Sequence, residues 1–572
     1  MKGDFIMKKK ILSRRITKRA WAYMVVIAMM ASMTGCGSKK MSEEKSDMTT
    51  GHTQDNSYLY DSTDEIMYTT EAVTQTNQGI MADSAACESE IEIYDEPEYS
   101  DPEFNTNEFS YTPENSWLSV KSSPLSTFAA DVDTAAYANI RTYINNGYEI
   151  DPSMVRIEEM INYFHYDYVK PEGGDKFAVD MEYADCPWND ETKLARISLA
   201  TEAIDFSEAP ASNIVFLVDT SGSMFDDNKL PLVQQSLMML AENFTEKDRI
   251  SIVTYAGADT VVLDGVAGDR YYDICSAIEG LEAYGSTNGS AGINTAYDIA
   301  AKHYIKGGNN RVILATDGDL NVGVTSESAL TELIIEKKKT GVFLSVIGVG
   351  YGNYKDNKLE SLADNGNGTY AYIDSVFEAK KTLVENLGSS LTTVAKDVKL
   401  QVEFNPEYVK GYRLIGYENR VMAAEDFADD TKDGGEMGAG HTVTALYEIA
   451  LVDSDFDINE PDLKYGSRSS GEELARTTGA DEELFTLNVR YKEPEAEESE
   501  LVTYVCGTSD YSEYGSDNLR WAAAVAEFGL LLKDSEYKGN ASYENVLGIA
   551  NELAGDDEYR KEFISLVEAC AD

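Results

Sequence analysis

The sequence predicts an α/β protein: a doubly wound, mainly parallel sheet, flanked by an antiparallel β domain and by small helical segments. Two observations lead to this fold class. Between residues 212 and 393, apolar runs of strand length alternate with segments of helical periodicity, which is typical of a parallel sheet with helices on both faces. After residue 394 the apolar pattern changes to a period of two, as in antiparallel strands.

Within the 212–393 region the apolar runs give the expected strands 213–218, 249–256, 311–316, 342–349 and 369–373. Helical periodicity gives the expected helices near 230–244, 270–283, 291–305, 326–339 and 375–388. Residues 214–218 are continuously apolar, which indicates a strand that is buried on both faces. Ligands of such sheets bind beyond the carboxyl ends of the strands.

The regions on either side of this domain carry shorter elements. We expect an N-terminal helical module at 116–172, a β lead-in at 173–211, an antiparallel β domain at 394–508 and a C-terminal helical module at 509–572. Helical spacing with capping residues predicts helices at 133–144, 153–163, 517–532, 542–553 and 557–571.

The β lead-in has the same alternating pattern as the later β domain. Phe177, Val179, Met181 and Tyr183 alternate with more polar residues, and 194–199 is the expected partner strand. We therefore hypothesise that the lead-in pairs with the strands after residue 394 and that the α/β domain is inserted between them. Those later strands are expected near 398–404, 412–417, 442–450, 485–491 and 501–506, with the acidic stretches 423–436 and 453–483 as loops.

The N-terminus has the features of an export signal. Basic residues precede the apolar segment 22–31, which is too short to span a bilayer comfortably, and Met33-Thr-Gly-Cys36 follows at once. This segment resembles a bacterial lipobox, with Met33 where Leu is usual. The resemblance implies a lipoprotein signal peptide over residues 1–35, a lipid on Cys36 and an extracytoplasmic protein anchored to a membrane of the bacterial cell envelope. An uncleaved signal anchor is the alternative.

Residues 36–115 are predicted to be an acidic, disordered stalk, because they are rich in acidic and small polar residues and contain few apolar runs. The whole chain of 572 residues has 101 acidic and 48 basic side chains and a formal net charge of −53. Such a charge repels nucleic acid and excludes it as a partner. Solubility outside a cell accounts for the acidity, with a calcium-rich or basic partner surface as the alternative.

A set of oxygen-bearing side chains follows two of the expected buried strands. Asp219, Ser221 and Ser223 follow the first, Asp317 follows the strand 311–316, and Thr287 lies in a turn-rich loop between them. Carboxylate and hydroxyl oxygens without thiol or imidazole suit a hard cation such as Mg²⁺, with Mn²⁺ or Ca²⁺ as alternatives.

The region 212–393 resembles a von Willebrand factor A (VWA) domain, a Rossmann-like fold. These five residues match the family's metal ion-dependent adhesion site (MIDAS). The resemblance implies that Ser221, Ser223 and Thr287 supply hydroxyl oxygens and that Asp219 and Asp317 act directly or through water. It also implies that a carboxylate of a protein partner completes the metal shell. Residues 115–572 are similar to the YfbK-like bacterial lipoproteins, notably at Ser126–Ala135, Arg156–Phe164, Cys186-Pro-Trp188, Trp521–Phe528 and Tyr559–Val567.

Other interpretations of these residues remain open. In the alternative, the domain binds no metal: the Ser and Thr residues of the set cap helices, and the carboxylates are exposed to solvent. Ser286, Asn288 and Asp319 fit turn or cap roles. Asp131-Val-Asp133-Thr134 superficially resembles a phosphatase motif, but helix capping by Asp133 explains it better because no companion lysine loop follows.

The sequence favours a non-enzymatic, surface-anchored adhesion protein that grips an acidic group of a protein partner through the metal. An envelope assembly or maintenance factor with a regulatory metal site is the alternative. A metal-dependent hydrolase would need a general base or nucleophile beside the metal, and the motif loops contain no histidine or lysine.

Overall fold

The computed structural model describes residues 109, 111–203, 209–285, 289–318, 327–351, 354–386, 392–432, 434–458, 482–494 and 496–571. These residues belong to one compact unit that spans 97–572. The signal peptide, Cys36, most of the stalk and Thr287 lie outside the described residues, so the predictions made for them stay predictions.

The α/β domain has the predicted mainly parallel sheet, with strand order β10-β9-β8-β5-β6-β7. Its parallel strands are β5 (Ser212–Asp219), β6 (Arg249–Tyr255), β8 (Asn309–Thr316), β9 (Phe343–Val349) and β10 (Tyr370–Ile373). The edge strand β7 (Asp259–Ala267) runs antiparallel to β6. The fold class predicted from the sequence is confirmed.

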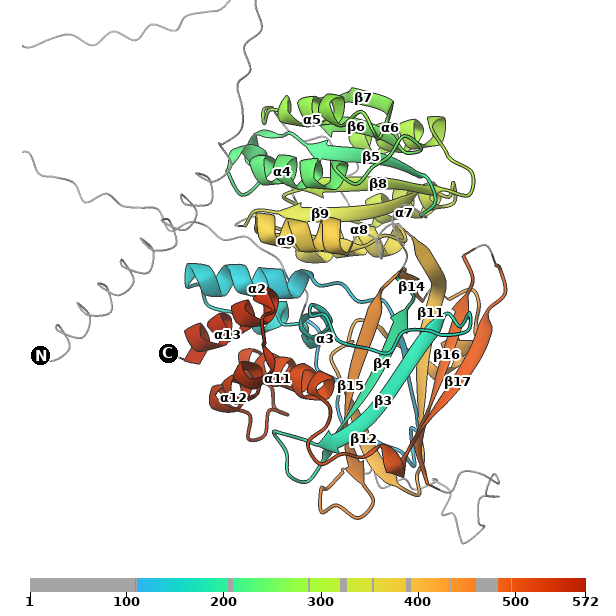
Figure 1. Cartoon of the computed structure of the whole chain (residues 1–572), viewed down its shortest axis with the longest axis vertical. Helices are drawn as coiled ribbons and strands as arrows, with labels where there is room; N and C mark the ends of the chain where they lie inside the picture. Colours follow the sequence, from blue (N-terminus) through green and yellow to red (C-terminus); the bar gives the residue numbers. More distant parts are fainter. Residues whose placement is uncertain are drawn as a thin grey trace, which may run out of the picture. The chain divides into compact units, whose positions relative to one another are not determined.

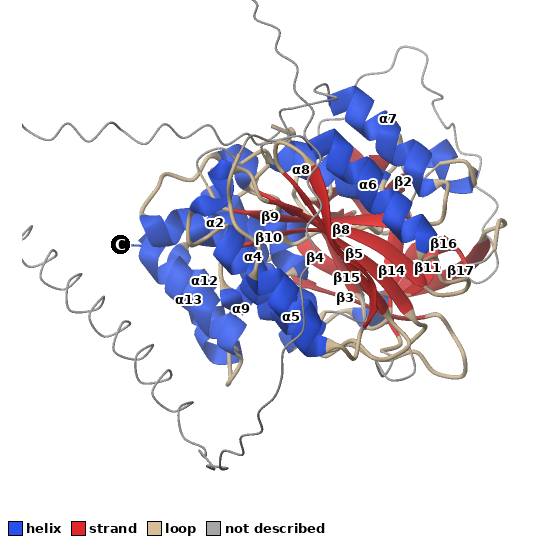
Figure 2. Ribbon diagram, turned by 90° about the horizontal axis from the view of Figure 1, so that it is seen from above, coloured by secondary structure: helices blue, strands red, loops and turns tan. Residues whose placement is uncertain are grey.

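Helices cover both faces of this sheet (Figures 1 and 2). They are α4 (Leu230–Ala241), α5 (Tyr271–Glu279), α6 (Gly289–Lys302), α7 (Glu327–Lys338), α8 (Asp356–Asn365) and α9 (Val376–Lys380). Along β5, Ile214, Phe216 and Val218 pack against α4 and α5, whereas Val215 and Leu217 face the core under α6, α7 and α8. This two-sided burial explains why the strand is apolar at every position.

Two elements of this domain were not predicted from the sequence. Strand β7 lies at the sheet edge, where Val261 and Val262 are exposed, so it lacks a buried face that would give an apolar period. Helix α8 buries a short apolar stripe of Leu359, Leu362 and Ala363 among polar residues, which is a weak signal for a helix.

The remaining strands form two antiparallel sheets that enclose a shared core. One has the order β1-β12-β15-β4-β3 and the other β13-β2-β11-β16-β17, with β14 paired to β11. The bounds are β1 (Leu118–Ser119), β2 (Leu125–Ala129), β3 (Phe177–Asp185), β4 (Lys193–Thr201), β11 (Thr393–Phe404), β12 (Val409–Ile415), β13 (Val421–Met422), β14 (Gly435–Gly438), β15 (Thr442–Leu451), β16 (Glu483–Lys492) and β17 (Glu500–Gly507). We call these two sheets the sandwich.

The sandwich is interrupted by the α/β domain, as the insertion hypothesis requires. Strand β4 pairs with β15 over its whole length, with Ala195 opposite Tyr447, although the α/β domain lies between them in sequence. The chain leaves and re-enters the sandwich at one place. There the Thr201 amide donates to the His441 carbonyl at 3.0 Å, and the Ala439 amide donates to the Thr392 carbonyl at 2.8 Å.

The prediction of a purely helical module at 116–172 was wrong. Strands β1 and β2 belong to the sandwich, where β2 pairs with β11 and Phe128 lies opposite Leu400. The run from Ser126 to Ala130 is too short to show a period, and its partner strand is far away in sequence. The predicted loop 423–436 likewise ends in the start of β14.

The helices that follow β2 pack against those that follow β17. Helices α2 (Ala135–Asn146), α3 (Ile157–Asn162), α11 (Asp517–Leu532), α12 (Tyr543–Leu553) and α13 (Glu558–Ala571) contribute to one hydrophobic core. Phe164 contacts Trp521 and Phe563 edge-to-face at centroid distances of 5.2 and 5.6 Å. None of the helices in the described part of the chain is both long and apolar enough to cross a membrane.

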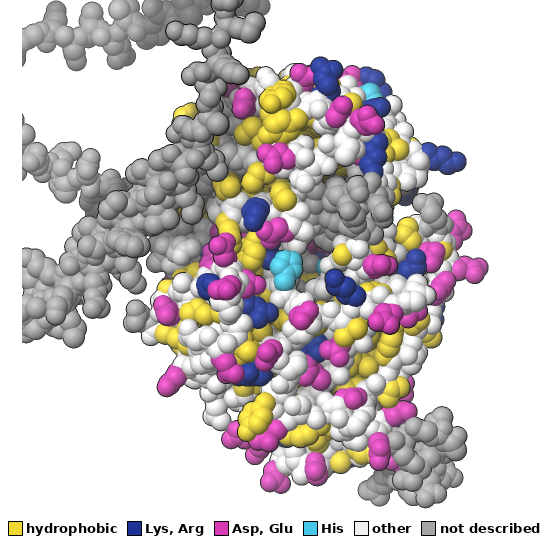
Figure 3. Space-filling model, viewed as in Figure 1, with side chains coloured by type: hydrophobic (Ala, Val, Ile, Leu, Met, Phe, Trp, Pro, Cys, Tyr) yellow, Lys and Arg dark blue, Asp and Glu magenta, His cyan; other side chains and the backbone are white. Residues whose placement is uncertain are grey.

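The surface seen in Figure 3 carries many acidic side chains, and they are spread over the sandwich rather than gathered in one patch. A scattered distribution of this kind keeps a protein soluble. In this view the acidic side chains form no concentrated patch.

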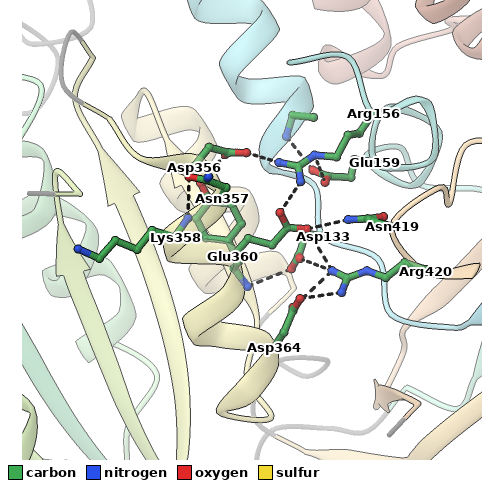
Figure 4. Close-up of polar contacts among 12 residues, drawn as sticks. Asp133, Arg156, Glu159, Asp356, Asn357, Lys358, Glu360, Asp364, Asn419 and Arg420 are labelled. Atoms are coloured by element: carbon green, nitrogen blue, oxygen red, sulfur yellow. Dashed lines mark hydrogen bonds and ion pairs between the residues drawn. The ribbon is translucent and has the colours of Figure 1, made fainter. Parts of the chain in front are cut away.

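A layer of buried ion pairs joins α8 to the helices and the sandwich (Figure 4). Arg156 pairs with Asp356 and Glu360 of α8 and with Glu159. Arg420 binds Asp364 of α8 at 2.7 Å and Asp133 at 3.1 Å. The Asp133 carboxylate also accepts the Tyr370 amide at 3.0 Å, so capping of α2 by Asp133 was a wrong prediction.

Carboxylates outnumber arginines in this layer, and their pKa values are shifted in different directions. Burial raises the pKa of Asp364 to about 7 and that of Glu159 to about 8, although Arg420 and Arg156 each act to lower it. Burial also acts to raise the pKa of Glu360, but Arg156 and Arg420 hold it below its ordinary value. The two arginines therefore stabilise this interface, because their positive charges balance the negative charges of carboxylates that are shielded from water.

Replacing Arg420 by Ala should lower the free energy of unfolding by about 3–5 kcal/mol, because the buried Asp133 and the half-buried Asp364 lose their cation. Urea denaturation followed by circular dichroism measures the change. Arg270→Ala is the matched control, because the Arg270–Asp273 pair is exposed and should contribute less than about 1 kcal/mol. Equal effects of the two variants would contradict the role assigned to the buried layer.

Candidate metal-binding site

Asp219 is the last residue of β5, and its side chain is completely buried. One carboxylate oxygen accepts the Ser221 amide at 2.9 Å, and the other accepts the Thr316 hydroxyl at 3.0 Å. Burial raises the pKa of Asp219 to about 6, the hydrogen bonds from Ser221 act to lower it, and Asp317 acts to raise it. The carboxylate is thus fixed in one orientation at the carboxyl edge of the sheet.

Asp317 lies beside it, because β5 and β8 are neighbouring parallel strands in register, with Val218 opposite Ala315. Asp317 directly follows β8 and is buried. The chain then turns through Gly318, whose φ of +92° and close approach to the Lys355 amide leave no room for a side chain. Two carboxylates that are far apart in sequence are therefore held next to each other.

Ser221 and Ser223 complete the described part of the set. They flank the start of a short 3₁₀ helix (Gly222–Phe225), and their hydroxyl oxygens are 3.0 Å apart. Ser221 is buried and Ser223 is exposed, so the pair reaches from the sheet edge to the surface. The loop before Thr287 is bound to the same turn, because the Gly222 amide donates a hydrogen bond to the Gly285 carbonyl at 3.1 Å. Thr287, Ser286, Asn288 and Asp319 lie outside the described residues.

The structure adds one residue that the sequence analysis missed. The Lys229 ammonium donates to an Asp317 carboxylate oxygen at 3.0 Å and to the Ser223 carbonyl at 2.9 Å. Lys229 precedes α4, outside the motif loops, so in sequence it resembles an ordinary surface lysine. The motif loops themselves contain no lysine, but the fold brings Lys229 from outside them to the motif.

The donor set fits a hard divalent cation. Asp219, Asp317, Ser221 and Ser223 offer only carboxylate and hydroxyl oxygens, which Mg²⁺ prefers in octahedral geometry with retained waters. Among the described residues no group of three or more His, Cys, Asp and Glu side chains is arranged to hold a metal, so a metal here would depend on the serine hydroxyls as well as the two carboxylates. A cation at this edge would meet Lys229, which already compensates part of the negative charge.

Comparisons with known proteins show which family the chain belongs to. A family model described as "von Willebrand factor type A domain" matches residues 213–386, "von Willebrand factor" matches 103–196, and "Uncharacterized protein YfbK, C-terminal" matches 389–572. The chain is 42% identical to YfbK of Escherichia coli strain K12 over 458 residues, which is 78% of each chain.

This chain belongs to the YfbK family of VWA-domain proteins. It is also 28% identical to the protein sll0103 of Synechocystis over 289 residues, covering 48% of this chain and 67% of that one. A solved von Willebrand factor type A protein from Catenulispora acidiphila is similar, with 13% identity, coverage of 69% of this chain and 89% of that one, and a TM-score of 0.37. The VWA domain implies, in general terms, a protein-interaction or adhesion-type role.

Replacing Lys229 by Met removes the ammonium but keeps most of the stem. Without divalent cations we expect the free energy of unfolding to fall by about 3 kcal/mol, because the buried Asp317 carboxylate loses a hydrogen-bonded cation. MgCl₂ should then stabilise Lys229→Met more than the wild type, because the metal no longer competes with the ammonium for Asp317.

Denaturation curves with and without MgCl₂ measure both effects. Lys302→Met is the control, since Lys302 pairs with Asp264 in an exposed position. The competition between Lys229 and a metal is excluded if MgCl₂ stabilises the wild type and Lys229→Met equally.

Proposed function

We propose that the protein is an extracytoplasmic, membrane-anchored binding protein that grips a protein partner through a divalent cation. Asp219, Ser221, Ser223, Thr287 and Asp317 would hold Mg²⁺, with Mn²⁺ or Ca²⁺ as alternatives, and a carboxylate of the partner would complete the shell. The observation that carries the proposal is the convergence of Asp219 and Asp317 beside the Ser221–Ser223 hydroxyl pair at one sheet edge. The lipid on Cys36 would provide the membrane anchor.

The surface around this edge has the features of a docking face. Phe225 and Tyr284 are 78% and 68% exposed, although large aromatic side chains are usually buried. Phe225 ends the 3₁₀ helix of the site, and the Tyr284 amide donates to the Thr220 carbonyl at 2.8 Å. Exposed aromatic residues next to a polar anchor are typical of protein interfaces.

A groove beside the site extends this face. Its volume is about 1190 Å³, and Asp226, Asp227 and Lys229 line it next to Tyr148 and Tyr351. A partner whose carboxylate reached the metal would place neighbouring residues in this groove. A bound cation would also reduce the negative potential that repels an acidic group from so acidic a protein.

The test uses the full-length protein as bait for crosslinking on intact cells. We expect capture of a specific partner that EDTA abolishes and added Mg²⁺ restores. Ser221→Ala and Asp317→Ala should lose at least about 90% of the captured partner, because each removes a donor that a metal with strict octahedral geometry requires. Ser276→Ala, an exposed serine on α5 of the same domain, is the matched control.

The proposal fails if capture is unchanged in EDTA, or if Ser221→Ala and Ser276→Ala capture equally well. Turnover of a substrate that depends on the same residues would instead favour the hydrolase. Partners from the cell envelope would identify an assembly or maintenance role, and partners from outside the cell an adhesive one.

A further inference from the structure

A polar cavity lies at the joint between the inserted α/β domain and the sandwich. Its volume is about 130 Å³, and its lining includes Arg311 near the amino end of β8, Thr369 and Tyr370 at the start of β10, and His441 between β14 and β15. This is where the chain leaves and re-enters the sandwich. Since one water occupies about 30 Å³, the space suits a few waters or one ion of phosphate size.

Arg311 is a buried cation that makes no ion pair with the described carboxylates, although Glu436 lies near enough to attract it. Its side chain is only 4% exposed, and its Nη1 donates to the Ser345 hydroxyl at 2.6 Å. The Nε atom has no hydrogen-bond partner among the described residues, and the guanidinium lies over the Phe343 ring, 5.7 Å from its centroid. Burial lowers the pKa of Arg311 to about 10, so the group stays charged at neutral pH. A buried guanidinium without a counter-ion is costly, and oxyanions match its fork of donors.

The other lining groups indicate which anion fits. Thr393 and Thr442 provide hydroxyl groups, and His441 provides an imidazole. Asp131 and Asp133 also line the cavity, but both are paired with Arg420. Glu436 lines it too and attracts Arg311 electrostatically, which disfavours ions with more than one negative charge.

We infer that this cavity binds a small, singly charged oxyanion, a carboxylate or dihydrogen phosphate, with the Arg311 guanidinium as its principal partner. Bound there, the anion would connect β8 of the α/β domain with the segment before β15 of the sandwich, at the joint between the two. The site is separate from the candidate metal site, because Arg311 and Asp317 lie at opposite ends of β8, about 20 Å apart along the strand. It does not depend on the proposed function.

Isothermal titration calorimetry of the full-length protein tests the inference. Sodium phosphate and sodium acetate are titrated separately at constant ionic strength, with sodium chloride as the reference and EDTA present to keep divalent cations away. We expect saturable binding of at least one of the two anions at one site. Arg311→Met should weaken it at least about tenfold, because the charged fork is lost. Arg311→Lys keeps the charge without the fork and should weaken binding less.

Arg270→Met, an exposed arginine of the same domain, should bind as the wild type does. Phosphate binding alone would identify a phosphate-type ligand, and acetate binding alone a carboxylate. If Arg311→Met does not fold, Arg311→Lys tests the inference alone, and it should bind the anion more weakly than the wild type does. The inference is overturned if neither anion binds at concentrations up to about 20 mM, a range that would detect even millimolar dissociation constants. It is also overturned if the folded Arg311 variants bind as tightly as the wild type.

Discussion

The pairing of β4 with β15 is the constraint on which the rest of the structure depends. These strands are neighbours in the sandwich although the whole α/β domain separates them in sequence. The inserted domain must therefore begin and end at one place, where Thr201 and Thr392 both bond to the segment 439–441. Arg311, near the amino end of β8, faces this joint, whereas Asp317 follows the carboxyl end. The closure of the sandwich thus leaves the edge with Asp219, Ser223 and Asp317 away from the joint.

Two arginines, Arg156 and Arg420, hold helix α8 of the inserted domain against the elements outside it. Helix α8 carries Asp356, Glu360 and Asp364, and Arg156 and Arg420 reach them from outside the domain. Salt bridges of this kind add little net stability compared with apolar contacts, but breaking one is costly because a charge stays buried. We expect these ion pairs to specify one arrangement of the domain against its surroundings, because their geometry is directional whereas that of an apolar contact is not.

Much of the fold could be predicted from the sequence because it is encoded locally. Helix α11 spans Asp517–Leu532, as its periodicity predicted, and β5 is apolar throughout because both of its faces are buried. Strand β2 could not be predicted, because it gains its stability from pairing with β11, far along the chain. The order of Asp219, Ser221, Ser223 and Asp317 indicated the candidate site, since parallel strands end at one edge. Lys229 and Arg311 gave no signal, because only the tertiary structure shows that these cations are buried.

The central claim is that these oxygen donors hold a divalent cation, and anomalous X-ray scattering from crystals grown with MnCl₂ tests it most directly. The account predicts a strong manganese peak in contact with the Ser221 and Ser223 hydroxyl groups, between Asp219 and Asp317, with the Lys229 ammonium displaced from Asp317. The absence of a peak at this edge at saturating Mn²⁺, with Lys229 still bound to Asp317, would contradict the account.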